Sequence, residues 1–177
     1  MRSVLAGIVA VWLVVSGCAA PGWCAGGEEA GDAPEFDLAA ERIGGLRLDM
    51  PAAEVLAGVA CPPAKGRETF EAASGDYVQT WKMADCGLEL KMQSERKGGP
   101  KTVAAIEVQA PADLATGQGI RIGSSEAEVL AAYGRFRDQE GFSKPGKTFV
   151  AGSVYGGLMF TFKNGRVAGM FLGAAAE

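Results

Sequence analysis

The sequence predicts an α+β fold of two tandem repeats, each a short helix followed by an antiparallel meander of three or four strands. The first observation behind this prediction is an internal repeat. Residues 45–60 read GLRLDMPAAEVLAGVA and residues 119–134 read GIRIGSSEAEVLAAYG, with seven of sixteen positions identical. The second is that segments of alternating apolar and polar residues, the period of a half-buried strand, follow each copy. A recurring motif of this kind is one supersecondary unit, so the fold must contain both copies, with helices on one face of a sheet.

The repeat also extends upstream of the motif. Asp-Leu-Ala at residues 37–39 matches Asp-Leu-Ala at residues 113–115, and each follows shortly after a proline, Pro34 or Pro111. The spacing to the motif differs by two residues between the copies. We therefore assign residues 35–110 to repeat 1 and residues 111–177 to repeat 2.

Each copy of the motif predicts a helix. In the second copy, Ser125 and Glu128 have the spacing of a capping box. In the first, Pro51 suits the first helical turn, where a missing N–H costs nothing. Residues 61–63 (Cys-Pro-Pro) and Gly134 are expected to end the two helices. The apolar residues expected on one helical face are Val55, Leu56 and Val59 in the first copy and Val129, Leu130 and Tyr133 in the second.

Alternating segments predict the strands of each meander. They are residues 77–83, 88–92 and 106–108 in the first copy and 158–162 and 167–172 in the second. Asn164-Gly165 predicts a tight hairpin between the last two strands. The first copy has a longer turn at 96–101. Residues 66–72 and 135–139 are candidates for a further edge strand in each copy.

The N-terminal residues predict export. Arg2 precedes an apolar run at residues 4–15, which is too short for a permanent membrane-spanning helix and is typical of a signal peptide. We assign residues 1–17 to the signal peptide and 18–34, rich in Gly, Ala, Pro and Glu, to a flexible tether. Residues 15–20 (VSGCAA) resemble a bacterial lipobox, which predicts lipidation of Cys18 and a place in the cell envelope. The alternative is ordinary cleavage near Ala20, Ala25 or Gly26, which would give a soluble secreted or periplasmic protein.

The four cysteines fit an exported protein, because disulfides persist outside the cytoplasm. Cys18 is lipidated or removed. Cys61 and Cys86 both lie in the first repeat and are the natural disulfide. Cys24 is then left over, which counts slightly against lipidation.

Composition argues against catalysis and nucleic-acid binding. The net charge is −4, without the basic stripe that a nucleic-acid surface needs. Histidine is absent, which removes Ser-His and Cys-His pairs and the commonest metal ligand. Asp76 and Asp85 fit turn positions, and Glu54 and Glu128 fit helix starts. We therefore expect no enzyme activity, no catalytic residues, no cofactor and no metal site.

The motif resembles the tandem repeat of the β-lactamase inhibitory protein-like fold and its single-copy relatives, the SmpA/OmlA (BamE) outer-membrane lipoproteins. The residues that carry this resemblance are 119–124 (GIRIGS), Glu128-Val129 and Tyr133-Gly134, with their partners in the first copy. The resemblance implies that the free, concave face of the sheet binds a partner protein, often through aromatic residues. Tyr77, Trp81 and Tyr155 become the candidate contacts. A strand aromatic is more often a core residue, however, and no contact motif of an inhibitor is present.

Three functions remain open at this point. The first, which we favour, is a lipid-anchored, non-enzymatic envelope protein that docks another protein through its sheet. This function predicts an apolar or aromatic patch on the face away from the helices. The second is a soluble inhibitor of an enzyme, with a rigid concavity across both repeats. The third is a binder of an apolar ligand or cell-wall fragment, with a pocket between helix and sheet.

Overall fold

The computed structural model describes residues 34–175. The predicted signal peptide, the predicted lipidation site at Cys18, Cys24 and nearly all of the predicted tether lie outside these residues. Within the described part, no helix is long and apolar enough to cross a membrane.

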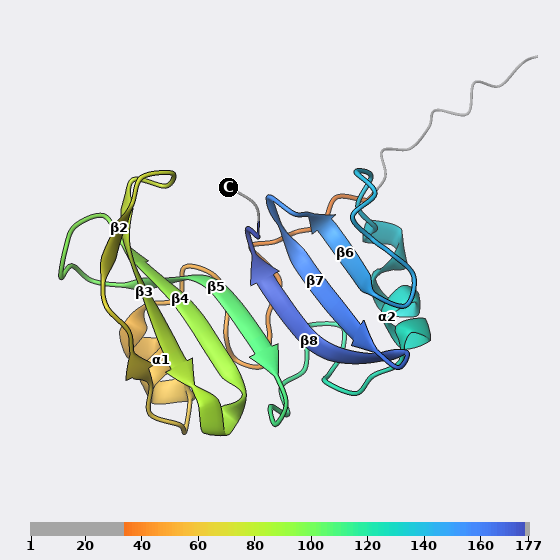
Figure 1. The fold of residues 1–177 in the computed structure, drawn as a ribbon, viewed down its shortest axis with the longest axis horizontal. Helices are drawn as coiled ribbons and strands as arrows, with labels where there is room; N and C mark the ends of the chain where they lie inside the picture. Colours follow the sequence, from red (N-terminus) through yellow and green to blue (C-terminus); the bar gives the residue numbers. More distant parts are fainter. Residues whose placement is uncertain (1–33, 176–177) are drawn as a thin grey trace, which may run out of the picture. The chain divides into compact units, whose positions relative to one another are not determined.

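The described residues form an α+β fold, as predicted, with short helices and one large antiparallel sheet (Figure 1). The helices are α1 (Ala52–Gly58) and α2 (Glu126–Tyr133), with 3₁₀ turns η1 (Ala84–Cys86) and η2 (Gly134–Phe136). The strands are β1 (Ala64–Lys65), β2 (Thr69–Glu71), β3 (Asp76–Met83), β4 (Leu88–Ser94), β5 (Thr102–Gln109), β6 (Thr148–Ser153), β7 (Gly156–Lys163) and β8 (Arg166–Gly173).

The strand order across the sheet is β1-β3-β4-β5-β8-β7-β6, with β2 also paired to β3. We call α1 with β1–β5 the N-terminal half and α2 with β6–β8 the C-terminal half. The two halves meet where their last strands pair, with Ile106 opposite Leu172 and Val108 opposite Met170. This β5–β8 seam makes a single sheet of the two meanders (Figure 1).

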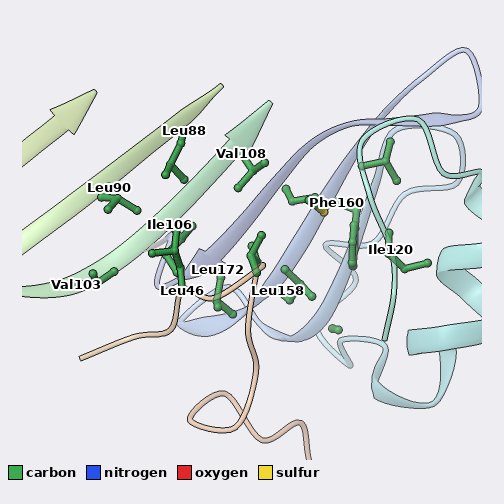
Figure 2. Close-up of a cluster of buried hydrophobic side chains, with 14 of the residues drawn as sticks. Leu46, Leu88, Leu90, Val103, Ile106, Val108, Ile120, Leu158, Phe160 and Leu172 are labelled. Carbon is green, nitrogen blue, oxygen red and sulfur yellow. The ribbon is translucent and has the colours of Figure 1, made fainter. Parts of the chain in front are cut away.

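One face of the sheet carries the core. Alternate strand residues point to this helix side, including Leu90, Ile106, Leu158 and Leu172, each with no exposed surface. Figure 2 shows these side chains lying together with Leu46, which precedes α1. The same buried cluster includes Val55 of α1 and, from α2, Val129 and Tyr133. Both helices therefore cover this side of the sheet.

Several local predictions are confirmed. Ser125 Oγ accepts a hydrogen bond from the Glu128 N–H at 3.2 Å, and the Glu128 carboxylate accepts one from the Ser125 N–H at 2.6 Å, so the capping box is present. Asn164 and Gly165 have positive φ and join β7 to β8 in a two-residue turn. Cys61 and Cys86 form the predicted disulfide, with their Cα atoms 6.2 Å apart. A disulfide is typical of an oxidising compartment.

Other predictions are wrong in detail. Residues 135–139 contain a 3₁₀ turn rather than an edge strand, and the edge strand is β6, whose β-prone Thr148, Phe149 and Val150 the alternation pattern did not single out. Helix α1 ends at Gly58, before residues 61–63. Leu56 and Leu130 are 47 % and 38 % exposed, because each short helix buries a narrower face than its apolar residues span.

The segments that precede the two helices pack on opposite halves of the sheet. Phe36 lies over the C-terminal half, with its ring centroid 6.4 Å from that of Tyr133 and 5.7 Å from that of Phe136. Leu114, by contrast, lines a pocket beside α1 in the N-terminal half. The two segments cross where the Gly44 N–H donates to the Ala115 carbonyl at 2.7 Å.

A buried carboxylate fixes this crossing. Glu41 Oε1 accepts hydrogen bonds from the N–H groups of Arg42 and Gly117, at 2.9 and 2.8 Å. Glu41 Oε2 accepts one from the hydroxyl of Tyr133 at 3.0 Å. Because Tyr133 belongs to α2, the N-terminal segment is tied to the C-terminal half through a side chain that is only 8 % exposed.

Candidate functional site

The face of the sheet away from the helices, the open face, is covered by no helix among residues 34–175 (Figure 1). The strand register decides which side chains point to it. Lys91 lies opposite Thr80 and Ala105, and Glu107 lies opposite Glu89 and Phe171. Polar and apolar side chains therefore share this face.

The C-terminal half of the open face holds an apolar hollow of about 380 Å³. Met159 and Phe171 stand side by side in its floor, because they are direct partners on β7 and β8. Val150 of β6 is 3 % exposed, whereas Phe142 in the loop before β6 is 44 % exposed and forms a wall. This arrangement presents half-buried apolar side chains to solvent, as a protein-binding surface does.

Two further hollows continue across the open face of the N-terminal half, with volumes of about 320 and 310 Å³. The 320 Å³ hollow shares Glu107 and Phe171 with the apolar hollow. It shares Glu71, Lys91 and Ala105 with the 310 Å³ hollow. The three hollows therefore form one trough across the β5–β8 seam, which we call the open-face trough.

The charges of the trough are concentrated in the N-terminal half. Lys91 pairs with Glu71 at 2.9 Å, and Lys82 pairs with Glu89 at 2.9 Å. Glu107, at the seam, is exposed and has no hydrogen bond or ion pair for its carboxylate among residues 34–175. An unpaired carboxylate beside an apolar hollow favours a ligand with a cation next to an apolar group.

A loop holds Phe142 at the rim of the trough, and Asp138 holds the loop. The Asp138 carboxylate accepts hydrogen bonds from the Phe142 N–H at 2.7 Å and from the N–H and hydroxyl of Ser143. Burial opposes the charged form, but these bonds, together with one from the Gly141 N–H, outweigh it and hold the pKa of Asp138 below its ordinary value. The loop is therefore ordered by an ionised carboxylate.

The structure does not bring the three predicted aromatic contacts together. Trp81 is 2 % exposed and points to the helix side, where its indole N–H donates to Gln79 Oε1 at 2.9 Å, so it is a core residue. Tyr77 points to the same side, half-buried against Phe70. Tyr155 is 65 % exposed in the β6–β7 turn, outside the trough.

The residues that line the apolar hollow were missed in the sequence, although a signal was present. Met159 and Phe171 occupy the strand positions that alternate with the core residues, where polar residues are the norm on a solvated face. Apolar residues on both faces of β7 and β8 are therefore the sequence signal of this surface. Phe142 carries no such signal, because it lies in a loop.

Asp76, Asp85 and Tyr133 are titratable groups that lie away from the trough. Asp76 opens β3 and Asp85 lies in η1 beyond its other end, so β3 separates these two carboxylates. Within residues 34–175, no group of three or more His, Cys, Asp or Glu side chains is placed to hold a metal ion. Burial raises the pKa of the Tyr133 phenol well above its ordinary value, which keeps this hydroxyl protonated as the donor to Glu41.

Comparison with models of protein families, with curated proteins and with solved structures finds no match for this chain.

Proposed function

We propose that this chain is an exported, non-enzymatic binding protein that docks a partner protein in the open-face trough. The observation that carries this proposal is the apolar hollow of about 380 Å³ around Met159 and Phe171, continuous with polar hollows across the seam. Protein interfaces combine half-buried apolar side chains with neighbouring polar groups, and the trough presents both.

The chemistry of the trough favours a polypeptide partner over a membrane or a nucleic acid. Its charges are mixed, with Arg67 and Lys91 among Glu71, Glu89 and Glu107. An anionic lipid surface or a phosphate backbone would need a basic patch. The unpaired Glu107 favours a partner that presents a Lys or Arg next to its apolar anchor.

We further propose that the two halves are copies of one unit, spanning residues 35–110 and 111–177, and that the protein is lipid-anchored at Cys18. The sequence repeat supports the first proposal and the lipobox-like residues 15–20 support the second. The Cys61–Cys86 disulfide agrees with export. The resemblance to the β-lactamase inhibitory protein-like fold, in which the concave face of the sheet binds a protein, supports the same mode of docking.

Site-specific photo-crosslinking in the native envelope tests the docking proposal. A photoreactive amino acid at Val78 or Thr161, which line the trough, is expected to give the same discrete protein adduct. The matched control places it at Leu56, which is exposed on the helix side. Adducts of equal yield from Leu56, or lipid alone from the trough positions, would contradict docking in the trough.

A substitution then tests the apolar anchor. Phe171→Asp is expected to weaken binding of the crosslinked partner by at least about thirtyfold, which corresponds to a hot-spot residue. Glu107→Gln should weaken it less and mainly slow association, because it removes a rim charge. Unchanged binding by a folded Phe171→Asp protein would rule out this hollow as the anchor site.

Inhibition of an enzyme is the second candidate, and the continuity of the trough across both halves favours it. A surface that spans two meanders joined in one sheet suits a partner with a protruding rim or loop. If the crosslinked partner is an enzyme, the two candidates are separated by adding the purified chain to it. Loss of its activity at stoichiometric protein, reversed by Phe171→Asp, would establish inhibition.

A further inference from the structure

A second apolar pocket lies on the helix side of the sheet, away from the open-face trough. It has a volume of about 380 Å³ and lies between the end of α1, the β3–β4 connection and the segment at 111–114. Leu46, Met50, Val59, Leu88, Ala112 and Leu114 form much of its lining. This volume falls at the small end of the range for small-molecule sites.

The corresponding place in the C-terminal half is filled by aromatic rings. There Phe36 packs between Tyr133 and Phe136 and lies against Gly152, where an added Cβ would come within 2.9 Å of the Phe36 ring. The upstream match of residues 37–39 with 113–115 aligns Phe36 with Ala112. The motif match aligns Tyr133 with Val59. The pocket beside α1 is thus the space that two aromatic side chains occupy in the other half.

The walls of the pocket are held in place independently of any ligand. Cys86 lies in the wall and is bonded to Cys61, which follows α1. At Gly87, an added Cβ would come within 2.8 Å of the Ala112 nitrogen, so the segment at 110–112 lies directly on the β3–β4 connection. The Gln109 N–H donates to the Gly87 carbonyl at 2.8 Å and fixes that approach. A pre-formed pocket does not have to be ordered when it binds, which favours affinity.

The rim of the pocket is acidic. Asp113 is paired with Arg121 at 2.6 Å, whereas the exposed Asp85 carboxylate has no hydrogen bond or ion pair among residues 34–175. A cation bound beside the apolar space would meet Asp85, and an anion would be repelled.

We propose that this pocket binds a small molecule that carries one aromatic ring and a positive charge. The ring takes the space that Phe36 fills in the other half, and the cation lies at Asp85. The site is separate from the open-face trough, so this proposal does not depend on protein docking there.

Methyl-resolved NMR titration of the folded chain tests this proposal. Phenethylamine is expected to shift the methyl signals of Leu46, Val59 and Leu114 and to leave those of Val78 on the open face unchanged. 3-Phenylpropionate, with a similar ring and a negative charge, should bind at least about fivefold more weakly, as expected for the loss of one exposed ion pair and the gain of a repulsion. Absence of shifts at the pocket methyls, or equal binding of both probes, would overturn the proposal.

Two variants locate the ring and the cation. Ala112→Phe restores the aromatic residue of the other half and should weaken phenethylamine binding at least about tenfold. The matched control is Ala168→Phe at an exposed position of β8, which should leave binding unchanged. If Ala112→Phe does not fold, Val59→Phe fills the same space from the residue that follows α1. Retention of full phenethylamine binding in folded Ala112→Phe or Val59→Phe would show that the probe binds elsewhere.

Asp85→Asn tests the position of the cation. It should remove the preference for phenethylamine over 3-phenylpropionate.

Discussion

Removing one hydroxyl should loosen the N-terminal segment from the C-terminal half. In Tyr133→Phe, Glu41 Oε2 loses the donor that now lies 3.0 Å away, while Oε1 keeps its two N–H donors. Glu41 is a buried residue, 8 % exposed, so little water can replace the missing donor. A hydrogen bond to a charged group contributes about 1.5–3 kcal/mol, and we expect a loss of about 2 kcal/mol in the free energy of unfolding.

Thermal and urea unfolding measure this loss. For a domain of this size, a change of about 2 kcal/mol should lower the Tm by roughly 4–8 °C. Tyr155→Phe is the matched control, because Tyr155 is 65 % exposed and its side chain forms no hydrogen bond among residues 34–175. It should change stability by less than about 0.5 kcal/mol.

A double-mutant cycle with Glu41→Gln tests the pairing itself. If the hydroxyl acts through Glu41, the two substitutions should be non-additive by about 1 kcal/mol or more. Additive effects, or a Tyr133→Phe protein as stable as Tyr155→Phe, would refute the argument that this bond secures the crossing of the two segments.

Three further outcomes are expected. Replacing Cys61 and Cys86 together by serine should lower the free energy of unfolding by about 3 kcal/mol, because the bridge closes a loop across a separation of 25 residues; equal urea midpoints with and without reductant would contradict this. The pKa of Asp138 is lower in the folded than in the unfolded chain, so its contribution to the free energy of unfolding is present above about pH 4 and is lost as the pH falls through the folded pKa. Asp138→Asn should therefore reduce the loss of stability in acid, and an unchanged dependence of stability on acid pH would argue against this role. Ser125→Ala should lower stability by about 1 kcal/mol in urea unfolding, since it removes the cap of α2, and a neutral result would mean that Glu128 alone caps the helix.

Local signals in the sequence predicted local structure well. The capping box at Ser125 and the Asn164-Gly165 turn each depend on residues within one turn of chain, and both are present. The Cys61–Cys86 disulfide was predicted because disulfides persist in exported proteins and because these two cysteines lie in the same repeat, whereas Cys18 is predicted to be lipidated or removed. The α+β class followed from the change of hydrophobic period along the chain.

The candidate site was harder to predict, because strand alternation defines two faces without saying which one the helices cover. Trp81 and Tyr77 lie on the same face of β3, and this is the face that the helices cover. The apolar residues of the other face, Met159 and Phe171, form a surface because no helix among residues 34–175 lies over that face. Which face of the sheet is covered depends on how α1 and α2 pack against it. The sequences of these two short helices do not encode that packing by themselves.

By itself, the sequence determined the α+β class, the helix starts, the tight hairpin and the disulfide, because each depends on neighbouring residues or on cysteine chemistry. The tertiary structure decided how the meanders join, through the β5–β8 seam, and how the segments before the helices exchange halves. It also decided that Phe36 packs between Tyr133 and Phe136, whereas Ala112 lines an apolar pocket beside α1. These features arise from contacts between residues far apart in the chain. Their free energy depends on the packing of the whole sheet, and no local pattern encodes it.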